Sequence, residues 1–259
     1  MQALGRRVNS LTVVIPTWNE APLIADCVRN AARIGDEVIV VDGGSVDETA
    51  EYARREGARV ILAEKGRGPQ LRAGAEAAKG EILLFLHADA RLPITARDAV
   101  LKALDDPEVI GGNFLIRFLP SSWFTRLLEP ANDVRRRVTK RFYGDSAIFI
   151  RASAYRLLGG FQPWPLMHDY AFSRRMEKAG RCAYVRSPCV FASARRFRGK
   201  ELRTLALWIT IQALYLVGTS PRWLSRFYPD VRGDDPETFI AEARTRTAAR
   251  SGPAGFSSR

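Results

Sequence analysis

The sequence predicts an α/β fold in a single domain, with a mostly parallel central sheet flanked by helices. Short apolar, β-branched runs alternate with helix-forming segments through the first half of the chain, which is typical of βαβ units. The run at residues 82–86 is apolar throughout, as expected of a strand that is buried on both faces of a parallel sheet. With 259 residues, the chain is long enough to bury one large core.

The expected elements of the first half are joined by short connections that contain glycine or proline. We expect the first strand to stop at Pro16, and the first helix to carry Pro22 in its first turn and to end at Gly35. The strands are expected at residues 11–15, 37–41, 60–63 and 82–86, and the two later helices at 45–56 and 70–78.

The second half is less regular. Its expected elements are a helix at 96–104, a strand at 109–118, a basic helix at 122–141, a strand at 147–151, a helix at 168–178 and short strands at 183–185 and 190–192. Residues 205–217 are apolar nearly all round but too few to span a bilayer. They predict a buried helix, a dimer face or an interfacial helix.

Composition narrows the partners and the compartment. Forty Lys and Arg residues against 28 Asp and Glu give a net charge of +12, which favours nucleotide phosphates, nucleic acid or an acidic membrane surface. The three cysteines, Cys27, Cys182 and Cys189, show no C-x-x-C spacing. We therefore expect reduced thiols in a cytoplasmic protein. The first residues lack the apolar core of a signal peptide.

Polar side chains follow three of the expected parallel strands. Asn19 and Glu20 follow the first strand, Asp42 ends the second, and His87 and Asp89 follow the run at 82–86. In open α/β sheets, ligands bind beyond the carboxyl ends of the strands, so these groups predict a site for a nucleotide diphosphate and its cation. Taken alone, each is also explained as a turn-forming residue that caps a strand.

The order of these motifs resembles that of a known enzyme family. The segments I-P-T-W-N-E, V-V-D-G-G-S-V-D-E-T, F-L-H-A-D-A and H-D-Y-A-F-S-R-R are similar to the motif series of family-2 glycosyltransferases, which have the GT-A nucleotide-diphospho-sugar transferase fold. The segments G-R-G-P-Q-L-R-A-G, H-A-D and S-A-R-R resemble one bacterial subgroup, associated with radical-SAM and selenium-related domains and with arsenosugar biosynthesis. The resemblance covers about residues 11–228.

The resemblance also implies a division of the chain and a set of site residues. The GT-A domain would cover 8–228, with a nucleotide-binding part at 11–92, an acceptor part at 93–200 and an apolar helix at 201–217, before a polar tail at 229–259 whose last residues, 251–259, are expected to be disordered. Asp89 would hold Mg²⁺ or Mn²⁺, and Asp169 would be the general base, with His168 beside it. The nucleotide and its diphosphate would contact Pro16, Asn19, Glu20, Asp42, Arg67, Gln70, His87, Arg195 and Arg196.

Two of these assignments have structural alternatives. Arg195 and Arg196 would stabilise the leaving diphosphate, but a solvated basic face explains the same pair. Asp169 would remove the acceptor proton, and an aspartate at a helix N-terminus also satisfies backbone N–H groups.

His87 and His168, the chain's two histidines, stand where the family commonly has carboxylates. A neutral imidazole can still bind a cation or a diphosphate. A protonatable imidazole at 168 is expected to keep Asp169 ionised to lower pH than a second carboxylate would.

The resemblance implies an inverting glycosyltransferase of the hexosyltransferase type. It would transfer a sugar from a UDP-sugar, with a GDP-sugar as the second choice, to an acceptor hydroxyl. The acceptor is expected to be lipid-like, and a peripheral position on an anionic membrane surface and a homodimer are further expectations. Two alternatives are a nucleotidyltransferase that forms nucleotide sugars and a degenerate nucleotide- or RNA-binding protein, although the sequence contains no recognisable nucleic-acid module.

Overall fold

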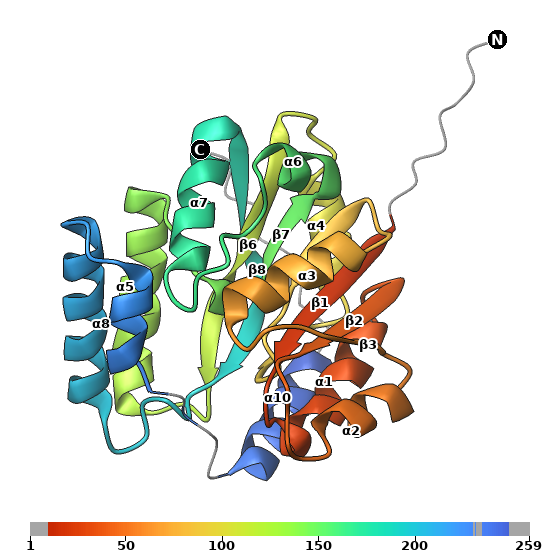
Figure 1. Ribbon diagram of the computed structural model, residues 1–259, viewed down its shortest axis with the longest axis horizontal. Coiled ribbons are helices and arrows are strands. Elements are labelled where there is room, and N and C mark those ends of the chain that lie inside the picture. The colour runs from red at the N-terminus through yellow and green to blue at the C-terminus, as the bar shows by residue number, and fades with distance from the viewer. Residues whose placement is uncertain (1–9, 230, 232–234, 249–259) are drawn as a thin grey trace.

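The computed structural model describes residues 10–229, 231 and 235–248. Within this part of the chain, eight strands form one sheet in the order β3-β2-β1-β4-β7-β6-β8-β5 (Figure 1). The first half of the sheet is parallel throughout, since β1 pairs with β2 and β4, and β2 pairs with β3. Its strands are β1 (Leu11–Thr17), β2 (Glu37–Asp42), β3 (Arg59–Leu62) and β4 (Ile82–Phe85).

The second half of the sheet is mixed. β7 is antiparallel to both β4 and β6, β6 and β8 are parallel, and β5 is antiparallel to β8. Four of the seven pairings are therefore parallel, which agrees with the expected mostly parallel sheet. The strands are β5 (Ala90–Arg91), β6 (Val109–Leu119), β7 (Ile148–Arg151) and β8 (Arg181–Ser193).

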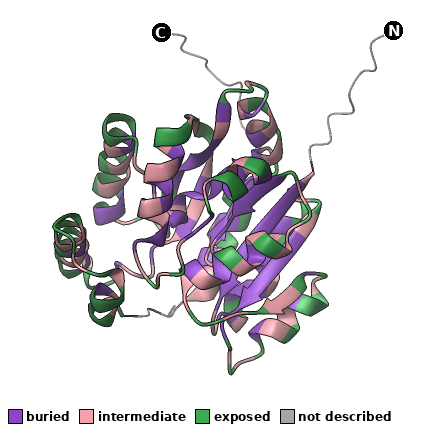
Figure 2. Ribbon diagram, turned by 45° about the horizontal axis from the view of Figure 1, so that its top comes forward, coloured by how far each residue is buried: buried purple, intermediate pink, exposed green. Residues whose placement is uncertain are grey.

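Helices cover both faces of the sheet, and the strands alternate between two cores. Val13 and Ile15 face α1 (Ala21–Ala32), α2 (Thr49–Arg55) and α4 (Ala96–Ala103). Val14 packs in the other core with side chains of α3 (Arg67–Ala77), α6 (Ala152–Leu157) and α7 (His168–Ala179). Figure 2 shows the strands mainly in the buried colour beneath these helices.

A further group of helices lies beside the sheet, on the left of Figure 1. α5 (Trp123–Thr139) begins at Ser122, whose side chain forms a capping box with Thr125. α8 (Glu201–Leu216) buries only Thr204 and Ile211 among its residues. The interpretation of this segment as a buried core helix is therefore wrong. The short elements α9 (Pro221–Leu224), η1 (Gly144–Ser146) and η2 (Ser225–Phe227) complete the group.

Several boundaries differ from the sequence expectation. β1 continues through Pro16, which pairs with Val41 and needs no hydrogen-bond donor of its own at that point. α2 begins only at Thr49, because Ser45 donates its backbone N–H and its hydroxyl to the Asp42 carboxylate. The two short strands expected at 183–185 and 190–192 are parts of β8, whose register against β6 shifts between Phe114 and Ile116.

The segment expected to be a polar tail contains a further helix, α10 (Pro236–Ala248). Phe239 and Ala243 are buried in a small core with Leu23 of α1, and Ile240 packs against it. Apolar residues at 239, 240 and 243 fall on one helical face, a spacing that the polar composition of the region conceals. Residues 251–259, expected to be disordered, lie outside the described part of the chain.

Candidate active site

The carboxyl ends of β1 and β2 form one side of the site. Thr17 and Asp42 are register partners at these ends. The buried Asp42 carboxylate accepts hydrogen bonds from Ser45, and Ser45 Oγ accepts one from the Asn19 N–H at 2.8 Å. Asn19 has a positive φ of 51° and its Oδ1 accepts from the Val46 N–H. Held in this way, the two loops leave a fixed polar edge beyond the strands.

Gln70 joins these two strand ends from α3. Its Nε2 donates to the carbonyl oxygens of Thr17, at 2.6 Å, and of Val41, at 2.7 Å, and the residue is 3% exposed. Both amide hydrogens are therefore engaged with the backbone. In this structure Gln70 positions the strand ends that were expected to meet the nucleotide.

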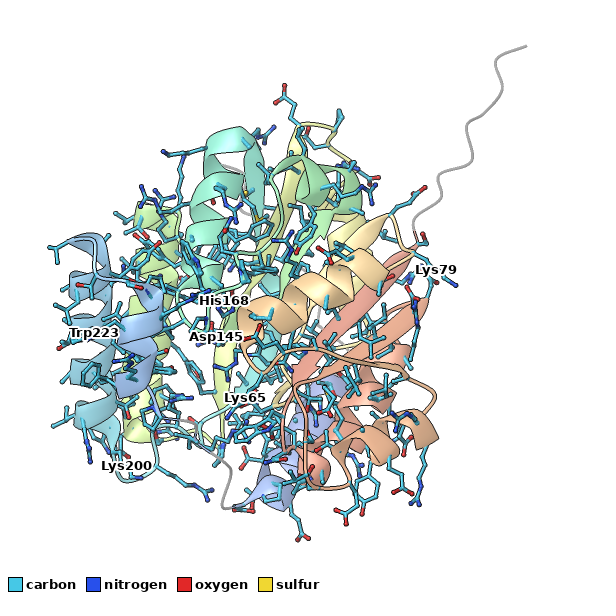
Figure 3. The ribbon with its side chains drawn as sticks, viewed as in Figure 1. Lys65, Lys79, Asp145, His168, Lys200 and Trp223 are labelled. Carbon is cyan, nitrogen blue, oxygen red and sulfur yellow. The ribbon has the colours of Figure 1, made fainter. Side chains whose placement is uncertain are left out.

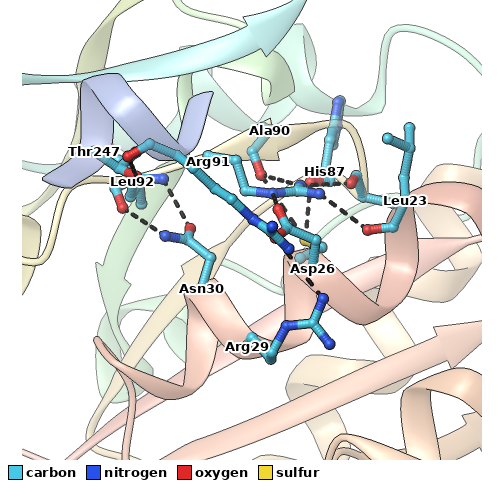
Figure 4. A network of polar contacts seen from close by, with 12 residues as sticks. Leu23, Asp26, Arg29, Asn30, His87, Ala90, Arg91, Leu92 and Thr247 are labelled. Carbon is cyan, nitrogen blue, oxygen red and sulfur yellow. Dashed lines mark hydrogen bonds and ion pairs between the residues drawn. The ribbon is translucent and has the colours of Figure 1, made fainter. Parts of the chain in front are cut away.

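Hydrogen bonds from Arg91 fix the turn that carries His87 and Asp89 (Figure 4). Arg91 is 1% exposed and donates to the carbonyl oxygens of Ala88 and Ala90 at 2.8 and 2.7 Å. Its Nε donates to Asp26 Oδ2 of α1 at 2.7 Å. These bonds satisfy two carbonyls of the turn, which fixes the backbone on either side of Asp89.

Asp89 shares a guanidinium with Glu20. Arg195 follows β8 and lies 2.9 Å from Asp89 Oδ2, and it makes a bidentate pair with Glu20 at 2.9 and 2.6 Å. The antiparallel pairing of β5 with β8 brings these distant segments together. Burial opposes ionisation of Asp89, but the nearby charge of Arg195 outweighs it and holds the pKa of Asp89 well below its usual range.

Asp169 lies in the first turn of α7. Its Oδ2 accepts the Gly144 N–H at 2.8 Å, and its Oδ1 accepts the Tyr170 N–H at 2.7 Å. A Cβ added at Gly144 would lie 3.4 Å from Asp169 Oδ2 and 3.0 Å from His87 Nε2. The glycine thus lets the Asp169 carboxylate, from the start of α7, and the His87 imidazole, from the turn after β4, approach the same point.

Both histidines are neutral near pH 7. Burial lowers the pKa of His87 to about 4 and also lowers the pKa of His168, against the attraction of neighbouring carboxylates. His168 is 3% exposed. His168 is therefore uncharged near pH 7. The expectation that an imidazole at this position keeps Asp169 ionised to lower pH than a second carboxylate would stays a prediction.

Asp145 is a site residue that the sequence analysis missed. It lies in η1, and burial together with the charge of Asp169 raises its pKa to about 6. The sequence shows only Tyr143-Gly144-Asp145 before a strand, which reads as an ordinary turn. Asp145 follows Gly144, which lies close to His87. This neighbourhood can be recognised only from the three-dimensional structure.

One cavity of about 570 Å³ is lined by His87, Asp89, Asp145 and Asp169 together. Figure 3 labels two of its lining residues, Asp145 and His168. Of the residues expected in the site, the cavity is lined by Arg67, His87, Asp89, His168, Asp169, Arg195 and Arg196. The other five, which are not among its lining residues, are Pro16, Asn19, Glu20, Asp42 and Gln70.

The residues present fit a divalent cation that is shared with a ligand. His87 Nε2 is buried, lacks a hydrogen-bond partner among the described residues, and lies one residue from the ionised Asp89. The described residues contain no cluster of three or more His, Cys, Asp or Glu side chains able to enclose a metal ion. Mg²⁺ is commonly held by one or two carboxylates together with substrate phosphates, and such a site needs no protein cage.

The α/β sheet, with charged groups beyond the carboxyl ends of its strands, agrees with the GT-A fold that the sequence predicted. Residues 12–159, more than half of the chain, match glycosyl transferase family 2, and the chain belongs to this family of transferases. A PGL/p-HBAD biosynthesis glycosyltransferase of Mycobacterium tuberculosis is 30% identical over 179 residues, 63% of this chain and 68% of that protein. An undecaprenyl-phosphate 4-deoxy-4-formamido-L-arabinose transferase of Edwardsiella ictaluri is 26% identical, over 57% of this chain and 50% of that protein.

Solved structures confirm the fold. Glucosyl-3-phosphoglycerate synthase from Mycobacterium tuberculosis, crystallised with Mn²⁺, UDP-glucose and phosphoglyceric acid, superposes with a TM-score of 0.59 at 20% identity. The match covers 82% of this chain and 81% of that chain. The radical-SAM-associated subgroup stays a prediction. Among the described residues, no helix combines the length and apolarity needed to cross a bilayer.

Proposed function

We propose that the protein is an inverting glycosyltransferase that transfers a sugar from a UDP-sugar to an acceptor hydroxyl. The observation that carries the proposal is the joint cavity, which Asp89 and Arg195 line together with Asp169 and Asp145. A diphosphate leaving group needs positive charge, and an attacking hydroxyl needs a base. The cavity contains a positive charge for the leaving group and a carboxylate for the acceptor hydroxyl.

The nucleotide end is assigned to the edge formed by β1, β2 and the start of α3. Lys65 Nζ lies 3.1 Å from the centre of the Trp18 ring, beside the polar loops of Asn19 and Asp42. We assign contact with the base to Asp42 and its loop, with Pro16 and Gln70 shaping that edge. Arg67 and Arg196, which line the cavity, would contact the diphosphate, and Glu20 would act by holding Arg195.

Asp89 is proposed to hold Mg²⁺ or Mn²⁺, with His87 turned toward the same ion or the diphosphate. The mycobacterial synthase was crystallised with Mn²⁺ and UDP-glucose, which supports this choice of cation and donor. When bound, the cation would neutralise charge that accumulates on the departing diphosphate. Arg195 would add a fixed positive charge from the protein.

Asp169 is proposed as the general base. The acceptor oxygen attacks the anomeric carbon, a new C–O bond forms, and its proton passes to the Asp169 carboxylate. The bond from the anomeric carbon to the diphosphate oxygen breaks, and its electron pair leaves with the diphosphate. The two hydrogen bonds that fix Asp169 direct the carboxylate without using its full acceptor capacity. A single displacement of this kind inverts the anomeric centre.

A donor screen tests the proposal. The melting temperature would be measured with UDP, GDP and CMP, each with and without Mn²⁺, and the preferred nucleotide would be supplied as its α-linked sugar donor. We expect UDP with Mn²⁺ to give the largest increase and the transferred sugar to be β-linked. An α-linked product would contradict the single displacement, and no stabilisation by any nucleotide would contradict the donor site.

The same protein samples can be used to test the two alternative functions, a nucleotidyltransferase and a degenerate nucleotide- or RNA-binding protein. Release of pyrophosphate from UTP and a sugar phosphate would favour the nucleotidyltransferase, and salt-sensitive RNA binding without any response to UDP would favour a degenerate binding protein. We also propose a cytoplasmic protein that attaches to the anionic face of the membrane through α8 and nearby arginines. Flotation with anionic vesicles at low and physiological salt tests that attachment, and a protein that floats in neither condition removes it.

A further inference from the structure

The cavity is larger than the set of polar groups just described, and its remaining wall is apolar. Phe114, Ile116 and Phe118 alternate along β6 and therefore point to the same face. α5 contributes Leu128, and α8 contributes several more apolar side chains. The apolar part of the wall comprises Phe114, Ile116, Phe118, Leu128, Leu205, Trp208, Ile209, Ile211 and Leu216.

Three polar side chains that line the same cavity each have at least one buried nitrogen without a hydrogen-bond partner among the described residues. Gln212 accepts the Tyr143 hydroxyl on Oε1 at 2.8 Å, but its buried Nε2 makes no hydrogen bond. Nη2 of Arg136 and both ring nitrogens of His168 are also buried without a partner among the described residues. Arg136 and His168 are 5% and 3% exposed. Buried polar groups are nearly always paired, so their shared cavity indicates that a bound ligand satisfies them.

The apolar wall continues to the surface along α8. Ile209 and Leu216 line the cavity and yet are 62% and 59% exposed. They are seven residues apart, so they lie on one face of the helix. Leu202, a further seven residues toward the N-terminus, is 70% exposed. The cavity therefore opens onto an apolar stripe of α8, defined by Leu202, Ile209 and Leu216, which none of the described residues covers.

We infer that the acceptor is a long-chain hydroxylated lipid, bound between β6, α5 and α8. This rests on the proposed function, because it names the acceptor of that reaction. The hydroxyl end lies at Asp169 among the unpartnered polar groups, the first part of the chain fills the apolar wall, and the remainder leaves over Ile209 and Leu216. A short polar acceptor would leave this wall wet. The apolar stripe is continuous with the cavity that Asp169 and Asp145 line. This favours a substrate, rather than a second copy of the chain, as the group that covers the stripe.

Quenching of Trp208 fluorescence by brominated alcohols tests the inference directly. Trp208 lines the cavity, and the difference between the wild-type signal and that of Trp208→Phe isolates its emission. The probes are 11-bromoundecan-1-ol and 4-bromobutan-1-ol. Burial of each additional methylene group strengthens binding. The long alcohol should therefore quench at a concentration at least 30-fold below that of the short one.

Substitutions at the opening of the cavity distinguish binding in the cavity from nonspecific hydrophobic binding at the surface. Ile209→Glu/Leu216→Glu should weaken the long alcohol at least tenfold and the short one less than threefold. Leu157→Glu, at an 88% exposed helical leucine outside the cavity, should change neither. Equal quenching by both alcohols overturns the inference, as does an equal effect of Leu157→Glu. Loss of a dimer in the rim variant, with quenching unchanged, would assign the stripe to a subunit interface and would also overturn it.

A parallel arm keeps this result apart from the donor proposal. The same samples would be melted with UDP and Mn²⁺. A protein that binds the long alcohol but not UDP supports the lipid site and contradicts the donor site. A protein that binds UDP but shows no chain-length dependence overturns the lipid acceptor and leaves the transferase proposal standing.

Discussion

Two carboxylates in the same cavity experience different surroundings. Asp169 receives two backbone N–H groups, whereas burial and the charge of Asp169 raise the pKa of Asp145 to about 6. Asp169 is thus the carboxylate with a fixed orientation, and Asp145 is the one that takes up a proton just below neutral pH. This difference supports the proposed base role of Asp169 rather than Asp145.

Replacing Asp169 by asparagine should lower turnover by about 100-fold or more, the usual scale for loss of a general base. The amide keeps nearly the same shape but cannot take the acceptor proton. Donor affinity should change less than threefold, since Asp169 serves the acceptor. Steady-state kinetics together with nucleotide titration would check both, and near-normal turnover would refute the assignment.

Asp145→Asn should stabilise the protein at pH 7. The folded pKa of Asp145 lies above its unfolded value, so its stability contribution is fully present below the unfolded pKa and is lost as pH rises through about 6. The neutral amide avoids that loss, and we expect a gain of about 1 to 3 kcal/mol at pH 7 that vanishes near pH 4. Urea unfolding at the two pH values measures it, with the exposed Asp98→Asn as control. An equal effect at both pH values would contradict the account.

At the scale of elements, α10 is linked to the turn that carries His87 and Asp89 through the buried carboxylate of Asp26. Asp26 of α1 accepts from Arg91 and, at 2.7 Å, from Arg244 of α10. Burial opposes its ionisation, but the two guanidinium groups outweigh burial and lower the pKa of Asp26. α10 therefore supports the same Arg91 that fixes the backbone around Asp89.

This arrangement predicts unequal effects from its members. Asp26→Asn should destabilise the fold by about 3 to 5 kcal/mol, because it leaves the fully buried Arg91 without its counter-ion. Arg244→Ala should cost about 1 kcal/mol or less, since its side chain is 61% exposed. Denaturant unfolding of the two variants would show the difference. Equal losses would mean that Arg91 does not depend on Asp26.

The elements also show where sequence patterns are informative. Apolar runs such as that of β4 locate the parallel strands well, since burial on both faces leaves a continuous pattern. α10 was not predicted, because three apolar side chains among polar ones form only a weak apolar stripe. β8 was predicted as two short strands, because its register shift interrupts the sequence pattern. The apolar composition of α8 left its surroundings open, since only tertiary contacts decide whether an apolar face is covered.

On the scale of the whole molecule, the parallel half of the sheet carries the edge proposed for the nucleotide. Asp145 of η1, Asp169 of α7 and the apolar wall of β6, α5 and α8 lie beside its mixed half. Motif order along the chain was sufficient to predict the fold and to name seven cavity residues. The neutral state of His168 and the role of Gln70 were not predictable, because both depend on burial and on partners from other segments. Asp145 belongs to the same category, since its environment is assembled by η1 and α7.

The most direct test of the central claim measures cation-dependent nucleotide binding. Melting would be followed for the wild type and for Asp89→Asn, with UDP in the presence of Mn²⁺ or EDTA. UDP at 100 times its dissociation constant with Mn²⁺ should stabilise the wild type by about 2.7 kcal/mol. Most of that gain should disappear with EDTA or with Asp89→Asn, while Asp98→Asn behaves as the wild type. A UDP effect of full size in EDTA, or in Asp89→Asn with Mn²⁺, would contradict a cation-dependent donor site at Asp89.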